Sequence, residues 1–236
     1  MKQLLFLLAI ITAGSSSSGE GITVTGRVEL SHNTVRSPDL SGTAVWLTRI
    51  DNSARVYKAP AGERAQLLQK SKSFSPHLLV VPVGSSVEFP NQDPFFHNVF
   101  SLFEGKRFDL GLYESGSSRN VVFNREGISY IFCNIHPEMS AVVIALRTPY
   151  YGISDRRGLI VIPNVPPGLY EMQVWHERVL PESLKSLTRR VEIDLDSNSL
   201  GLLHLTEQPK LGQHHKNKYD HDYGDATPNS PVYSRP

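Results

Sequence analysis

The stretch GISYIFCNIHPEMSAVVIAL (residues 127–146) contains two apolar runs that flank a short loop. Both runs, GISYIF and AVVIAL, are short and rich in β-branched or aromatic residues, which is typical of buried strands. Cys133 ends the first run and Ser140 opens the second. The loop between them carries Cys133, His136 and Met139, whose side chains are all metal-ligand types. The stretch therefore predicts a strand–loop–strand unit with three potential ligands at one end of a sheet.

Further runs of the same kind precede this unit. They are short, β-branched or aromatic, and separated by turn residues: LLVVPVG (78–84), SVEF (86–89) and NVVF (120–123). No segment between them is long enough for a crossover helix, so we expect antiparallel pairing. Apolar and polar residues alternate again near both ends of the chain, as they do from Tyr170 to Val174. The sequence predicts an all-β protein, built as a sandwich or a Greek-key barrel.

The N-terminus is typical of an export signal. Lys2 precedes an apolar run from Leu4 to Ile11, and small residues follow, so residues 1–19 are predicted to be a cleaved signal peptide. No later segment has the length and apolarity of a membrane helix, so we expect no membrane span. The mature chain is predicted to be secreted, and in a Gram-negative host that location is the periplasm.

Cys133 is the only cysteine of the chain. In an oxidising compartment a lone thiol has no disulfide partner within its own chain and needs protection. Two explanations are open at this point, burial in an apolar core and a bond to a metal ion.

A metal site needs a fourth ligand, and His97 in DPFFHNVF is the candidate, far enough along the chain to lie on another strand. Phe95 and Phe96 would surround it with apolar surface. A thiolate, two imidazoles and a thioether form a soft ligand set that suits copper in both oxidation states. Zinc usually takes more cysteines or histidines and no thioether.

The pair His97-Asn98 and the run Cys133-x2-His136-x2-Met139 resemble the type 1 blue copper signature of the cupredoxin family, which includes plastocyanin and amicyanin. The short loop is most similar to that of amicyanin. The resemblance implies a cupredoxin Greek-key β-sandwich that binds copper. It also implies that both histidines and Cys133 are the strong ligands, that Met139 is the weak axial ligand, and that Asn98 braces the cysteine loop by hydrogen bonds.

The same resemblance implies a function. Cupredoxins of this kind carry single electrons between protein partners, and the ring edge of their second histidine lies near the surface. A redox partner is therefore expected to dock near His136, on an apolar rim that includes Phe95, Phe96 and Pro137. The net charge of +1 gives no sign of a nucleic-acid partner. We expect no small-molecule substrate and no enzyme activity, because no acid–base pair stands out.

Copper binding or delivery is the alternative function, in which a non-catalytic copper site belongs to a protein held at the cell surface. Fast, reversible one-electron chemistry would favour the carrier, and slow transfer of copper to an acceptor would favour delivery. An oxidase or nitrite reductase would need further copper ligands, typically His-x-His pairs or an adjacent Cys-His pair. None occurs in the predicted folded region.

The segments around the copper region contain three runs that resemble motifs of the carboxypeptidase-regulatory-like β-sandwich: Val24–Val28, Asp155–Gly158 and Pro166–Tyr170. We therefore predict that a cupredoxin domain, residues 64–147, is inserted in or packed with a second small β-sandwich formed by residues 20–63 and 148–206. A single long barrel of about seven to nine strands is the alternative.

Residues 207–236 have few aliphatic side chains and much Pro, Asn, Asp and Lys, so this segment is expected to be a disordered tail. The histidines of the tail (His214, His215 and His221) are interpreted as solvated side chains rather than a second metal site. His77 is interpreted as a surface residue, and His176 as a packing or surface residue.

Overall fold

Strands account for every described element except one short helix, so the predicted all-β fold class is confirmed. The computed structural model describes residues 21–32, 35–36, 39–50, 57, 65–102, 105–208, 216–219 and 221. The predicted signal peptide lies outside these residues. Among the described residues, no helix has both the length and the apolarity that a membrane crossing needs.

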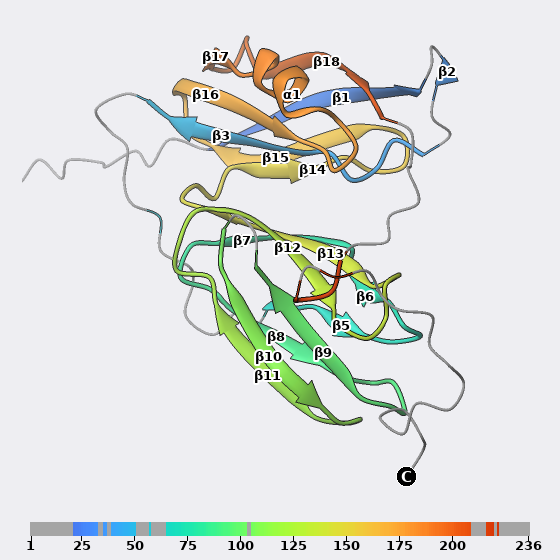
Figure 1. The fold of residues 1–236 in the computed structure, drawn as a ribbon. Coiled ribbons are helices and arrows are strands. Elements are labelled where there is room, and N and C mark those ends of the chain that lie inside the picture. Colours follow the sequence, from blue (N-terminus) through green and yellow to red (C-terminus); the bar gives the residue numbers. More distant parts are fainter. Residues whose placement is uncertain are drawn as a thin grey trace, which may run out of the picture.

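Residues 65–146 form one β-sandwich without contributions from other strands, and we call it the contiguous sandwich (Figure 1). One sheet has the order β10-β9-β12-β13-β7, the other has the order β11-β8-β4, and β5 and β6 form a separate hairpin. The strands are β4 (Ala65–Gln66), β5 (Leu68–Gln69), β6 (Phe74–Ser75), β7 (Leu78–Pro82), β8 (Ser86–Pro90), β9 (His97–Ser101), β10 (Phe108–Tyr113), β11 (Ser118–Val122), β12 (Gly127–Cys133) and β13 (Ser140–Leu146).

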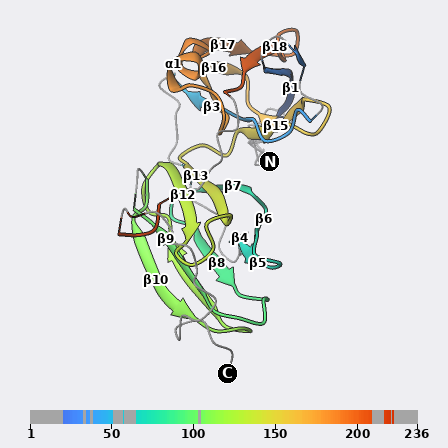
Figure 2. The same cartoon turned by 45° about the vertical axis from the view of Figure 1, so that its right-hand side comes forward.

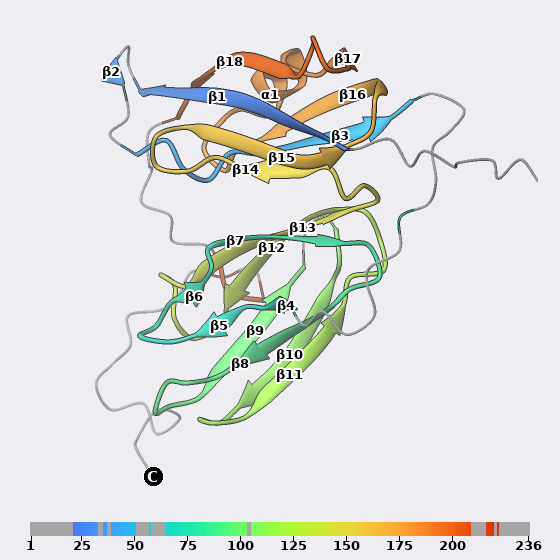
Figure 3. The same cartoon turned by 180° about the vertical axis from the view of Figure 1, so that it is seen from behind.

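The chain on either side of this unit forms a second sandwich, which we call the split sandwich (Figure 3). In one sheet β1 pairs with β15, with β2 and, in parallel, with β18, and the other sheet has the order β14-β3-β16-β17. Its elements are β1 (Ile22–His32), β2 (Val35–Arg36), β3 (Ala44–Arg49), β14 (Tyr151–Ile153), β15 (Leu159–Val165), β16 (Gly168–Trp175), α1 (Pro181–Ser186), β17 (Arg189–Ile193) and β18 (Ser199–Thr206).

Strand β13 belongs to both hydrophobic cores, because its two faces are covered by different neighbours. Successive side chains of a strand point to opposite faces. Ala141, Val143 and Ala145 lie in the core of the contiguous sandwich. Val142, Ile144 and Leu146 lie, with Val80 of β7, in the core of the split sandwich. Figure 2 shows β13 and β7 as the layer of the contiguous sandwich nearest the other one. The two sandwiches are therefore packed together through an apolar interface.

The start of the expected disordered tail is ordered where the structure describes it. Glu207 is 3% exposed, pairs with Val179 in a β-bridge, and contacts the guanidinium of Arg178. This ion pair ties the end of β18 to the segment that follows β16. Gln208 continues this contact, because its N–H donates to the carbonyl of Arg178 at 2.7 Å.

Candidate metal centre

Strand pairing brings the predicted ligands together. Strand β12 lies between β9 and β13, and Cys133 at its end is opposite Val99 of β9. His97 is the first residue of β9, two positions before Val99, so its ring reaches the same end of the sheet. Loop 134–139 connects β12 to β13 at this end. The expectation that His97 lies on a different strand from Cys133 is met by this arrangement.

Three potential donor atoms converge. The Sγ atom of Cys133 lies 3.6 Å from Nδ1 of His97 and 3.5 Å from Nδ1 of His136, and the two Nδ1 atoms are 3.2 Å apart. Among the described residues, this is the only group of three or more His, Cys, Asp or Glu side chains with donor atoms within 4.8 Å of one another. Each donor faces the other two, which is the arrangement that a trigonal metal site needs.

Met139 closes the loop over the cluster. Its amide N–H donates to the carbonyl of His136 at 3.0 Å, and its carbonyl accepts from the amide of Cys133 at 3.2 Å. The Met139 side chain is fully buried in the same apolar cluster as Cys133. The thioether is therefore buried with Cys133, which suits a weak metal ligand, and does not face the solvent.

Both imidazoles are neutral at neutral pH, as metal binding requires. Burial, together with the charge that His97 would carry, lowers the pKa of His136 to about 4. Burial also lowers the pKa of His97, against the opposing effect of the nearby Asp93 carboxylate. Each Nδ1 therefore presents a lone pair to the centre of the cluster when Nε2 carries the proton.

Two opposing effects act on the pKa of the Cys133 thiol. Burial raises the pKa of the thiol, while backbone N–H groups of Ile135, Asn98 and His136 lower it. N–H groups that point at sulfur stabilise its negative charge, so a cation at the centre would complete the stabilisation. The donor set of two imidazoles, a thiolate and a thioether fits copper.

Asp93 is a residue of the site that the sequence analysis did not identify. Its Oδ2 atom lies 2.9 Å from Nε2 of His97, and the side chains of both residues are buried. In the sequence, only the spacing of four residues between Asp93 and His97 in DPFFH could have indicated this contact. That signal is weak alone, because only the fold shows that the intervening turn brings the carboxylate back to the ring.

Aromatic side chains border the cluster. The ring centroid of Phe95 lies 5.3 Å from that of His97 and 5.4 Å from that of His136. Phe96 is 44% exposed, and His136 and Pro137 are half-buried. Phe95 therefore borders both imidazole rings, while the charges of Lys72 and Glu138 also act on His136.

Asn98 contacts the cysteine loop through its backbone. Its carbonyl accepts from the amide of Asn134 at 2.9 Å. Its side-chain amide instead donates to Asp109 at 2.8 Å. Lys218, a described residue of the C-terminal segment, contacts the same two side chains. Its backbone N–H donates to the Asn134 side chain at 2.9 Å, and its ammonium group donates to Asp109 at 2.8 Å. This part of the predicted disordered tail is thus hydrogen-bonded to the contiguous sandwich.

Where the structure describes them, the other histidines discussed above lie outside this cluster. His77 has an exposed side chain that lies 2.7 Å from Glu177 of the split sandwich. His176 is buried beside Glu207. His221 is exposed, whereas His214 and His215 lie outside the described residues.

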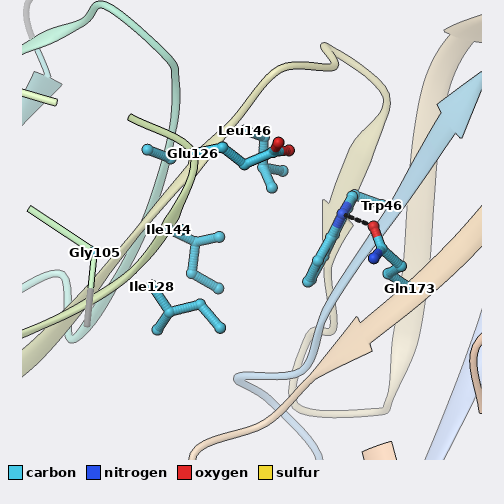
Figure 4. A pocket seen from close by; sticks show the side chains of 9 residues that line it. Trp46, Gly105, Glu126, Ile128, Ile144, Leu146 and Gln173 are labelled. Carbon is cyan, nitrogen blue, oxygen red and sulfur yellow. Dashed lines mark hydrogen bonds between the residues drawn. The ribbon is translucent and has the colours of Figure 1, made fainter. Parts of the chain in front are cut away.

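A cavity of about 340 Å³ lies where the two sandwiches meet (Figure 4). Trp46 donates to Gln173 at 2.6 Å on one side of it, and Ile128 and Ile144 lie on the other. The Glu126 carboxylate at its border pairs with Arg147. The cavity is mainly apolar and holds no cluster of metal-ligand side chains, so the His97–Cys133–His136 group remains the candidate site.

Comparison with known proteins found partial structural similarities. No family model and no curated protein matches the chain. A purple cupredoxin from Nitrosopumilus maritimus is 28% identical, over 35% of this chain and 99% of its own, with a TM-score of 0.32. Amicyanin from Paracoccus versutus is 22% identical, over 37% of this chain and 84% of its own, with a TM-score of 0.33. A copper-containing nitrite reductase from Thermus scotoductus is 24% identical, over 40% of this chain and only 25% of its own, with a TM-score of 0.36.

Proposed function

We propose that the protein is a secreted type 1 copper protein that carries single electrons between redox partners. His97, Cys133 and His136 would hold the copper ion as strong ligands, and Met139 would be a weaker fourth ligand. The observation that carries the proposal is the convergence of the three donor atoms within 4.8 Å of one another. When bound, copper would supply a one-electron couple between Cu(I) and Cu(II).

The chain's contribution is a ligand set that is already assembled. His97 and Cys133 are held by paired strands, and the loop with His136 and Met139 is closed by two backbone hydrogen bonds. Donor atoms that already lie together would favour fast electron exchange over metal release. The buried positions of His97 and Cys133 also favour a carrier over copper delivery, because an acceptor protein would have to reach them.

The accessible edge of His136 is the proposed exit for the electron. Phe95, Phe96 and Pro137 form the apolar rim on which a redox partner would dock. Electron transfer without conversion of a substrate is part of the proposal.

The architecture belongs to the same proposal. We assign the copper-binding domain to residues 64–147 and regard it as inserted into a sandwich formed by residues 20–63 and 148–206. In support, the described strands of each unit pair only with strands of the same unit. Secretion, to the periplasm in a Gram-negative host, rests on the signal-like residues 1–19, and sequencing the N-terminus of the exported protein would test it.

A visible absorption spectrum of the mature protein with one equivalent of Cu(II), before and after ascorbate, tests the function. We expect an intense blue or purple band that bleaches on reduction and returns on reoxidation, and Cys133→Ala should lack it. Absence of the band in the natural protein would overturn the proposal. If the band forms but copper passes to an acceptor chelator faster than electrons exchange, delivery becomes the better function.

A further inference from the structure

A surface turn is connected to the candidate copper ligand His97 through one buried carboxylate. The turn joins β5 to β6 and consists of Lys70, Ser71, Lys72 and Ser73, closed by two backbone hydrogen bonds between Lys70 and Ser73. Its two central residues have positive φ values, 55° for Ser71 and 51° for Lys72. Such values are costly for residues other than glycine and persist where the surroundings stabilise them.

Asp93 supplies that stabilisation. The amide of Ser71 donates to Oδ1 of Asp93 at 2.5 Å, and the amide of Lys72 donates to Oδ2 at 2.9 Å. Successive backbone N–H groups in a turn of this kind form a concave anion-binding site. The backbone of Asp93 is held as well, because its N–H donates to Oδ1 of Asn91 at 3.0 Å. The turn therefore fixes the carboxylate, and Asn91 fixes the backbone of the same residue.

The same carboxylate faces His97. Oδ2 lies 2.9 Å from Nε2 of the ring, so Nε2–H donates and Nδ1 is left as the metal-facing lone pair. Both carboxylate oxygens are thus occupied by N–H groups, Oδ1 by Ser71 and Oδ2 by Lys72 and His97. A carboxylate that accepts from three N–H groups is stabilised as an anion, and this one contacts the ring of His97 on the side away from the donor cluster.

We infer that Asp93, fixed by the Ser71–Lys72 turn, is a positioning residue that sets the His97 tautomer and lowers the reduction potential of the copper site. This inference rests on the proposed function. An anionic acceptor makes the imidazole a stronger electron donor at Nδ1, and a stronger donor favours Cu(II) over Cu(I). Hydrogen-bonded partners of metal ligands commonly change metal affinity by about 10–100-fold.

The first experiment compares Asp93→Asn with Glu138→Gln by redox titration of the copper-loaded proteins. Glu138 is an exposed carboxylate in the ligand loop that acts on His97 through its charge, so its variant removes the same charge without removing a hydrogen bond to the ring. We expect Asp93→Asn to favour Cu(I) over Cu(II) at least tenfold more than the natural protein does, which is a rise of about 59 mV for one electron. Glu138→Gln should shift the ratio by much less. Equal shifts, or no shift in Asp93→Asn, would overturn the inference.

The second experiment needs neither copper nor a stable variant. In metal-free natural protein, nitrogen-15 NMR of the histidine rings should show His97 protonated at Nε2. The amides of Ser71 and Lys72 should exchange slowly with solvent although both side chains are exposed. Fast exchange of both amides, or a proton at Nδ1, would contradict the inference even if copper binds. Absence of the coloured site with these signals present would instead overturn only the proposed function.

Discussion

At the scale of single residues, the contribution of the proposed axial ligand Met139 can be tested without disturbing the other three ligands. It is an apolar side chain fully buried beside Cys133, so its sulfur can be replaced without loss of volume. Met139→Leu is expected to keep copper and its visible band, because the strong ligands remain, and to change the reduction potential. Redox titration and the spectrum together check this prediction. Loss of all copper from the variant would show that Met139 is more than a weak ligand.

A second residue-scale prediction concerns His176, which is buried beside Glu207, Arg178 and Glu177. Burial lowers the pKa of His176 below its ordinary value of 6.5. The unfolded chain therefore takes up a proton near pH 6.5 while the folded chain does not, so the stabilisation is present above that pH and is lost as the pH falls below it. The metal-free protein should lose stability between pH 7.5 and pH 5.5, and His176→Gln should lose less. Urea midpoints at the two pH values measure this, and equal losses would assign the pH dependence to other groups.

At the scale of elements, β13 contributes side chains to both cores. A substitution at Ile144 tests the contribution of its outer face. Ile144 is 1% exposed and lies in the apolar cluster shared with the split sandwich. Ile144→Ala should cost about 2–5 kcal/mol of unfolding free energy, through lost burial and the cavity left behind. The absorption band should persist, because the side chain points away from the core that holds Cys133.

Ile153→Ala is the matched control, since Ile153 on β14 is 38% exposed. Its free-energy loss should be clearly smaller than that of Ile144→Ala. Similar losses for the two variants, measured by urea unfolding, would mean that the interface between the sandwiches contributes little.

At the scale of the whole molecule, the C-terminal segment contacts the copper region without supplying a proposed ligand. Deleting residues 209–236 should leave the visible band in place. The Lys218–Asp109 ion pair is partly exposed, and such pairs contribute about 0.2–1 kcal/mol. The deletion and Lys218→Ala should therefore reduce stability by similar small amounts, as measured by urea unfolding. Loss of the band on deletion would show that the tail takes part in the metal site.

The sequence predicts the local parts of this molecule well. The β12–β13 hairpin follows from two apolar runs, and the cluster of His97, Cys133 and His136 follows from motif spacing. Strand β18 is harder to predict, because Gly201 lies within it and its parallel pairing with β1 is a long-range contact. Asp93 and its turn are decided by tertiary contacts, since no local preference places Ser71 and Lys72 at positive φ.

The pairing of β1 with β15 and β18 also constrains the order in which the chain can fold. Both partners follow the copper segment in the sequence, and Ser31 of β1 contacts a residue 174 positions later. Contacts over such distances form slowly, whereas the strands between residues 65 and 146 find all their sheet partners within that segment. A chain that emerges N-terminus first would thus complete the contiguous unit while β1 still awaits its neighbours. During that interval the apolar outer face of β13 is exposed to solvent. Completion of the split sandwich therefore also buries a surface through which partly folded chains could aggregate.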